Sequence, residues 1–265
     1  MTYFVFADVH GHYSLLMKAL EESGYDINNP DHMLISLGDN FDRGKENYKM
    51  YQFLKKMKEL NKIILVKGNH EDLLLDMLYR RKPIYIDLTN GTYQTVDEFM
   101  QEFFGEEGID MMYKDPYTTY QKLKEIGFID FIYDMKDYYE TNYYIYTHGF
   151  IPVKQNEELD NFYEYDPAWR CANPKEFAKS RWINGIEMSR RYKIHELPKT
   201  IVVGHFHSSY GNVRQIYGDN LTSEEYRKLE FSNKEYFKPY VTEELIALDA
   251  CTIYSKLINV MVVED

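Results

Sequence analysis

The sequence predicts an α/β protein, because short apolar strands alternate with amphipathic helices and polar residues follow each strand. The first strand covers residues 3–7, and apolar residues then recur at helical spacing until Gly24. The same order returns twice, with strands at residues 33–37 and 63–66, each followed by a loop and a helix. Strands connected in this way are parallel, so the loops at their carboxyl ends should meet at one edge of the sheet.

The pattern weakens in residues 83–137, which are rich in Tyr, Asp and Glu. Apolar spacing still predicts helices around residues 96–104 and 117–126. We interpret residues 83–137 as an insertion that covers one side of the core.

Regular strands return at residues 143–147 and 200–203. Residues 218–244 are polar and predict a variable segment of loop and short helix. The chain closes with two further strands, residues 245–249 and 254–263, which we expect to lie side by side and antiparallel. Because no repeat or linker divides the chain, a single domain of 265 residues is predicted.

The composition excludes several classes of protein. With 43 acidic and 31 basic residues the net charge is −12, which argues against nucleic-acid binding by bulk attraction. The two cysteines, Cys171 and Cys251, rule out a disulfide scaffold and fit a reducing compartment. No signal segment is visible, and no apolar run approaches the roughly 18 residues of a membrane span. We therefore expect a cytoplasmic protein without membrane contact.

Residues that can bind metals follow five of the predicted strands. They are Asp8 with His10, then Asp39, Asn69, His148, and His205 with His207. Carboxylates and imidazoles suit hard to borderline divalent metals, and the lack of cysteine among them disfavours a structural zinc site. One such residue alone would be a surface histidine or a turn residue, but repetition at strand after strand favours a metal centre.

Five motifs in this order resemble those of the calcineurin-like metallophosphoesterases. They are Asp8-Val9-His10-Gly11, Gly38-Asp39-Asn40-Phe41-Asp42-Arg43-Gly44, Gly68-Asn69-His70-Glu71, His148-Gly149 and Gly204-His205. The complete second and third motifs are similar to the phosphoprotein (serine/threonine) phosphatase branch and its small bacterial and phage members. The resemblance implies two packed mixed β-sheets flanked by helices, a four-layer α/β/β/α sandwich.

The resemblance also implies a role for each metal-binding residue. The ligands would be Asp8, His10, Asp39, Asn69, His148 and His205, with Asp39 bridging two divalent ions. A water molecule made acidic by both ions would attack phosphorus. Manganese is the expected metal, although iron, zinc or magnesium would suit the same ligands.

His207 departs from the phosphoprotein phosphatase pattern, which usually ends with one histidine. Other metallophosphoesterases have Gly-His-x-His, so His207 is predicted as a further ligand of the first metal. The alternative is a histidine that contacts no metal.

Three further residues are implied to act on the substrate. His70 would donate a proton to the leaving oxygen, with Asp42 orienting it. Arg43 would bind the phosphoryl oxygens, and Asn69 would contact them as well. Glu71 is expected to support its helix start through hydrogen bonds rather than to bind metal.

A second phosphate-binding arginine lies between the last two histidine motifs in this family. We assign it to Arg181 and keep Arg170 as the rival.

The predicted function is hydrolysis of phosphate monoesters, with phosphorylated protein or a small phosphoester as substrate and a serine/threonine phosphatase as the preferred activity. The alternatives within the fold are a diadenosine tetraphosphatase and a phosphodiesterase. The complete Asp-Arg-Gly and Asn-His-Glu segments and the His70–Asp42 pair favour the monoesterase. A non-catalytic binding module is the alternative of a different class, and the presence of every ligand argues against it. Substrate choice would depend on residues 83–137 and 218–244.

Overall fold

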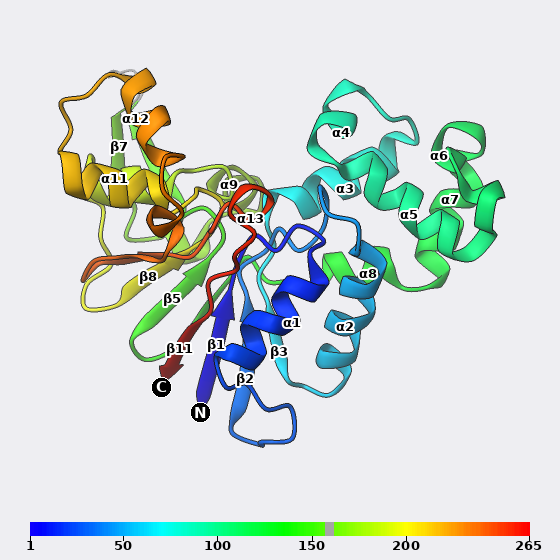
Figure 1. Ribbon diagram of the computed structural model, residues 1–265, viewed down its shortest axis with the longest axis horizontal. Helices are drawn as coiled ribbons and strands as arrows, with labels where there is room; N and C mark the ends of the chain where they lie inside the picture. The colour runs from blue at the N-terminus through cyan, green and yellow to red at the C-terminus, as the bar shows by residue number, and fades with distance from the viewer. Residues whose placement is uncertain (157–161) are drawn as a thin grey trace.

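The computed structural model describes residues 1–156 and 162–265. Two mixed β-sheets pack face to face at its centre, and helices flank them (Figure 1). The layer between the sheets is apolar: Val5 and Ile35 of one sheet belong to the same buried cluster as Tyr146 and Val202 of the other. The predicted α/β fold of two packed sheets flanked by helices is confirmed.

The first sheet has four strands in the order β11-β1-β2-β3. Its members are β1 (Thr2–Phe6), β2 (His32–Ser36), β3 (Ile63–Leu65) and β11 (Met261–Glu264). β1, β2 and β3 are parallel, as the alternation of strands and helices predicts, whereas β11 is antiparallel to β1. The helices that follow these parallel strands are α1 (Tyr13–Glu22), α2 (Asn47–Glu59) and α3 (Asn69–Arg80).

The second sheet has five strands in the order β4-β5-β8-β10-β9. They are β4 (Tyr138–Glu140), β5 (Tyr144–Thr147), β8 (Thr200–Val203), β9 (Tyr240–Val241) and β10 (Leu245–Ala247). The three inner strands are parallel and the two edge strands are antiparallel to their neighbours.

The prediction of two adjacent antiparallel strands at the end of the chain is wrong. β10 pairs in parallel with β8 in the second sheet, whereas β11 pairs with β1 in the first. The short helix α13 (Thr252–Ser255) lies between them in sequence. Apolar patterning identifies a strand but does not say which of two stacked sheets it joins, because both sheets bury a face in the same layer.

The insertion at residues 83–137 is helical and extends to the right in Figure 1. Its elements are α4 (Tyr85–Asn90), α5 (Thr92–Phe104), the 3₁₀ turn η1 (Gly105–Gly108), α6 (Met111–Lys114), α7 (Pro116–Glu125) and α8 (Phe128–Tyr133). The two helices predicted here are confirmed as α5 and α7. α7 begins at Pro116 because the Asp115 side chain accepts the backbone N–H of Thr118 at 3.0 Å. Val96 and Phe99 of α5 pack in the same core cluster as Leu54 of α2.

The remaining elements surround the second sheet. They are the β6 (Val153–Asn156) and β7 (Phe162–Tyr165) hairpin, η2 (Trp169–Cys171), α9 (Pro174–Ser180), α10 (Gly185–Arg190), α11 (Ser209–Tyr217), α12 (Ser223–Glu230) and η3 (Lys234–Phe237). Residues 218–244, predicted as loop and short helix, hold α12, η3 and β9. In the described part of the chain, no helix has the length and apolar character to span a membrane.

Candidate metal centre

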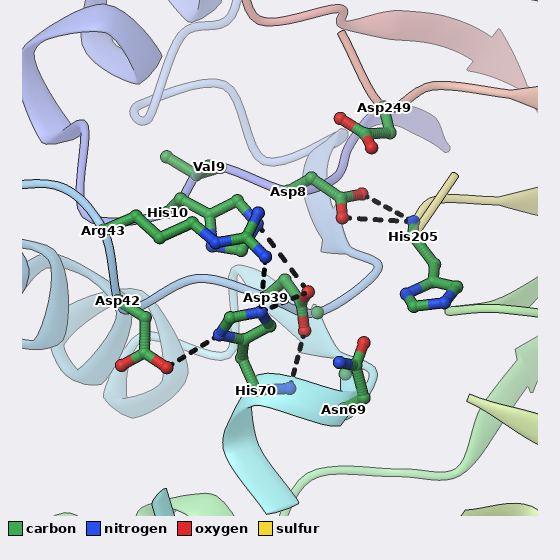
Figure 2. Close-up of polar contacts among 12 residues, drawn as sticks. Asp8, Val9, His10, Asp39, Asp42, Arg43, Asn69, His70, His205 and Asp249 are labelled. Carbon is green, nitrogen blue, oxygen red and sulfur yellow. Dashed lines mark hydrogen bonds and ion pairs between the residues drawn. The ribbon is translucent and has the colours of Figure 1, made fainter. Parts of the chain in front are cut away.

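The loops that follow five parallel strands meet at one edge of the two sheets. Within the first sheet, Asp8 N–H donates to the carbonyl of Gly38 (3.1 Å), and His10 N–H donates to the carbonyl of Asp39 (2.9 Å). Across the sheets, the backbone N–H of His205 donates to both carboxylate oxygens of Asp8, at 2.9 and 3.1 Å (Figure 2). The predicted convergence of strand ends is thus present, and it joins both halves of the fold.

Several of these loop residues have left-handed backbone conformations that L-residues rarely adopt. The φ angles of Asp8, His10, Asp39 and His205 are 53°, 48°, 52° and 64°. Such conformations cost about 1–3 kcal/mol each and gather where function requires a fixed side-chain direction. The backbone hydrogen bonds between the loops hold them in place.

The side chains form two overlapping groups of potential metal ligands. His10, Asp39 and His70 bring one ligand atom each to within 4.8 Å of one another, and Asp39, His148 and His205 do the same. Asp39 belongs to both groups. A shared buried carboxylate with imidazoles on either side is the donor chemistry that two neighbouring divalent ions require, so these residues fit a two-metal centre.

Backbone carbonyls fix which nitrogen of two histidines faces the centre. His10 Nδ1 lies 3.0 Å from the carbonyl of Phe41, and His148 Nδ1 lies 2.7 Å from that of Leu37. Because a carbonyl only accepts, each Nδ1 carries a proton and each Nε2 is left to bind a metal when the ring is neutral. His148 Nε2 also lies 2.8 Å from Asn69 Oδ1, which brings Asn69 to the second group.

The charges around Asp39, the residue shared by the two ligand groups, keep its carboxylate ionised. Burial alone would raise the pKa of Asp39, but the charges of His148 and His70 outweigh it and hold the pKa well below its usual range. Burial and the neighbouring His148 lower the pKa of His205 to about 4. Burial, with the charge of His70, also lowers the pKa of His10. His10 and His205 are therefore neutral at pH 7, as metal ligands must be.

Glu71 ties the second and third loops together beneath the ligands. Its buried carboxylate accepts the backbone N–H groups of Gly68 (2.8 Å), Asp39 (2.9 Å) and Asn40 (2.9 Å), and the Asn40 side-chain amide (3.2 Å). A Cβ on Gly68 would lie 2.2 Å from Asp39 Oδ1, so only glycine allows this close approach. The expected supporting role of Glu71 agrees with these contacts.

His70 and Asp42 form a buried ion pair beside the ligands. His70 Nδ1 lies 2.7 Å from Asp42 Oδ2 (Figure 2). Burial would lower the pKa of His70, but the charges of Asp39 and Asp42 raise it above its usual value. Above the pair, the exposed guanidinium of Arg43 lies 3.1 Å from His70 Nε2 and 3.2 Å from His10 Nε2. The guanidinium of Arg43 and the imidazole of His70 therefore face the space next to the ligand groups.

The two candidates for a second phosphate-binding arginine are both held by carboxylates. Arg181 is buried, and its guanidinium donates to Asp72 at 2.6 Å and to Asp137. Arg170 pairs with Glu140 and Glu196. The role of either arginine toward phosphate stays a prediction.

His207 lies outside the two ligand groups formed by the described residues. Its Nδ1 is 2.7 Å from Ser209 Oγ, and its ring contacts those of Phe206 and Phe231. Its role as a metal ligand also stays a prediction.

Asp249 was not predicted, although it follows strand β10 at the same edge. Its carboxylate is 8% exposed and lies beside Asp8 (Figure 2), whose pKa is raised by burial and by the charge of Asp249. The rule that identified the other residues, a polar side chain directly after a parallel strand, applies to Asp249 as well. The sequence does not indicate this position because apolar patterning alone predicts a terminal antiparallel pair for this strand.

Comparison with known proteins shows a local sequence similarity to a phosphatase. Over 75 residues the chain is 45% identical to serine/threonine-protein phosphatase 2 of Salmonella typhimurium, a match that covers 27% of this chain and 30% of that relative. The matched part of the chain thus spans 30% of the length of that curated relative.

Two solved structures share the fold. One is a cold-active protein-tyrosine phosphatase of a psychrophilic Shewanella species, with a TM-score of 0.53 and 17% identity over 100% of this chain and 75% of that one. The other, a cold-active protein tyrosine phosphatase solved at 1.1 Å, has a TM-score of 0.51 and 18% identity over 99% and 73%. The family profile described as calcineurin-like phosphoesterase matches residues 1–237. The predicted resemblance is confirmed: this chain belongs to the calcineurin-like phosphoesterase family.

Proposed function

We propose that this protein hydrolyses phosphate monoesters at a centre of two divalent metal ions, and that its substrates are phosphoserine and phosphothreonine in polypeptides. The observation that carries the proposal is the buried His70–Asp42 pair, 2.7 Å apart. His70 belongs to one of the two groups that share Asp39, and we propose that it acts as a proton donor rather than as a metal ligand. A proton donor next to a metal centre is most useful for esters with poor alkoxide leaving groups, such as those of serine and threonine.

Asp8, His10, Asp39, Asn69, His148 and His205 would hold the two ions, with His207 as a further candidate. When bound, the ions would lower the pKa of a water molecule and neutralise charge on the phosphoryl oxygens. Manganese is the metal we propose.

The chain's own residues have separate tasks in this proposal. Arg43 would bind phosphoryl oxygens with its guanidinium, which is exposed above the ligand groups. Asn69 would contact the same oxygens. His70 would release the proton on Nε2 to the leaving oxygen, while Nδ1–H stays bonded to Asp42. Arg181 would contribute a second cation only by leaving Asp72 and Asp137, which now hold its guanidinium.

A groove beside the centre supports a polypeptide substrate. It has a volume of about 1060 Å³, and its lining includes Trp182. This residue is 51% exposed, and the centroid of its ring lies 5.9 Å from that of the His205 ring. The volume exceeds that of a single side chain several-fold. Its lining has two lysines but three carboxylates, which gives no surplus positive charge for a tetraphosphate chain. The charged residues are Lys154, Lys179, Asp166, Glu176 and Glu187.

Two other features are compatible with the proposal. Local similarity to a serine/threonine-protein phosphatase supports protein substrates. We also propose that the protein acts in the reducing cytoplasm, where Cys171 and Cys251 would stay as free thiols.

The test is a comparison of three substrates with metal-stripped protein to which Mn²⁺ is added. They are a phosphoserine/phosphothreonine peptide, diadenosine tetraphosphate and an aryl phosphodiester. Fastest turnover of the peptide supports the proposal. Faster turnover of either other compound would refute the proposal that phosphorylated polypeptides are the substrates. No turnover of any of the three, with metal bound, would favour a non-catalytic binding module.

A further inference from the structure

Two threonines of the insertion hold the carboxylate that orients His70. Thr92 Oγ1 donates to Asp42 Oδ2 at 2.9 Å, and Thr95 Oγ1 donates to Asp42 Oδ1 at 2.7 Å. Thr92, Thr95 and Asp42 are each completely buried. Both carboxylate oxygens of Asp42 therefore have a hydroxyl donor, in addition to the imidazole of His70 on Oδ2.

The threonines reach Asp42 because the first turns of α5 are packed against the second motif. Gly91, which precedes α5, has a left-handed backbone (φ 87°), and a Cβ there would lie 2.3 Å from the backbone nitrogen of Arg43. The backbone N–H of Asp42 in turn donates to Thr95 Oγ1 at 3.1 Å. Positions 92 and 95 are three residues apart, so both hydroxyls lie on one face of the helix.

Glu98, one further step along the same face, continues this contact. Its carboxylate accepts the Asn47 side-chain amide at 2.8 Å and the Tyr48 N–H at 2.9 Å. The α5 face is thus fixed to the start of α2, directly after the second motif. Loss of a threonine hydroxyl alone should leave this attachment in place.

These contacts determine the direction of the Asp42 carboxylate. The hydroxyls of Thr92 and Thr95 hold the Asp42 carboxylate in one orientation. In this orientation Asp42 Oδ2 also lies within hydrogen-bond distance of His70 Nδ1. That bond keeps the proton on Nδ1 and turns Nε2 toward Arg43 and Asp39 (Figure 2). Without a hydroxyl, a buried charged oxygen loses a donor and the carboxylate is free to rotate.

We propose that Thr92 and Thr95 are positioning residues for proton donation by His70, acting through Asp42. The inference rests on the proposed function, since it concerns the same leaving-group step. It gives the insertion a part in the chemistry as well as in covering the core. The competing explanation is that the hydroxyls only fasten α5 to the body of the protein.

The test uses Thr92→Val and Thr95→Val, which replace each hydroxyl by a methyl group of similar size. We would compare p-nitrophenyl phosphate, whose leaving group needs little protonation, with a phosphoserine peptide, whose leaving group needs it. We expect kcat on the peptide to fall about 10- to 100-fold, with KM and bound Mn²⁺ unchanged and kcat on p-nitrophenyl phosphate within about threefold. Thr→Ser at either position should restore the peptide rate.

Thr119→Val is the matched control. Thr119 is also a completely buried threonine of the insertion, but its hydroxyl donates to the carbonyl of Asp115 at 3.0 Å. This change should leave the ratio of the two rates as in the wild type. Equal losses on both substrates in the Thr92 and Thr95 variants, or no loss, would overturn the inference.

A double-mutant comparison keeps the test decisive if a valine variant is unstable. In a His70→Asn background, Thr95→Ser and Thr95→Val should give equal peptide rates, because the step they support is already absent. A further loss with valine in that background would show a structural role and refute the inference. Absence of monoesterase activity in the wild type would instead refute the proposed function itself, so the two failures are distinguishable.

Discussion

Replacing Glu71 by Gln should destabilise the protein strongly, although the side chains are nearly identical in shape. The Glu71 carboxylate accepts two N–H groups on each oxygen: Gly68 and Asp39 on Oε2, and the two Asn40 donors on Oε1. In the glutamine variant one oxygen still accepts two of these N–H groups. The other oxygen is replaced by an NH₂ group, which cannot accept the remaining two. The structure thus predicts two lost hydrogen bonds and buried donors that oppose each other.

The magnitude follows from those two donors. Hydrogen bonds to a charged group contribute about 1.5–3 kcal/mol each, which gives a gross loss of about 3–6 kcal/mol. Removing the charge also removes its burial cost, which is visible in the raised pKa of Glu71. We therefore expect a net loss of about 3 kcal/mol and a fall in Tm of about 6–12 °C.

The assay is thermal and urea unfolding of the metal-free protein, with Glu225→Gln as the control. Glu225 occupies the same third position of its helix, α12, and also accepts the N–H of the residue before the helix, Thr222, at 2.8 Å, but it is exposed. Its replacement should shift Tm far less. Equal shifts in the two variants would refute the view that Glu71 joins the two loops.

Three further predictions concern the metal centre and the proton donor. Asp39→Asn should reduce bound Mn²⁺, measured by mass spectrometry, well below the wild-type content, and full retention would contradict a shared ligand. His70→Asn should lower kcat on a phosphoserine peptide about 10²-fold or more at unchanged metal content, and an unchanged kcat would contradict its role as donor. Mn²⁺ binding near pH 6.5 should release protons. Burial lowers the pKa of His148, but the charge of Asp39 outweighs burial and raises this pKa above its usual value, so more than half of the His148 rings carry a second proton at this pH when no metal is bound. Calorimetry of Mn²⁺ binding in buffers of different ionisation heat measures this proton release, and a binding heat that is the same in every buffer would contradict the prediction.

Much of the site was predictable because parallel strands deliver their carboxyl ends to one edge. Asp8, Asp39, His148 and His205 each follow a strand that could be recognised from its apolar run. The parallel arrangement of the strands is enough to predict that these residues lie near one another. The residues implied by family resemblance needed no tertiary information either.

The contacts that support the ligands could not be predicted in the same way. Thr92 and Thr95 are ordinary residues in an amphipathic helix, and only packing of α5 on the second motif brings them to Asp42. Asp249 was hidden by the assignment of its strand to a terminal hairpin. The ion pairs of Arg181 link α9 to segments distant in sequence, which no local pattern reveals.

The most direct test of the central claim is to titrate metal-free protein with Mn²⁺ while phosphate release from a phosphoserine peptide is measured. We predict no activity without metal and a rise that saturates at about two ions per chain. Activity that persists in the metal-free protein, or that saturates at a single ion, would contradict a two-metal phosphomonoesterase built around Asp39.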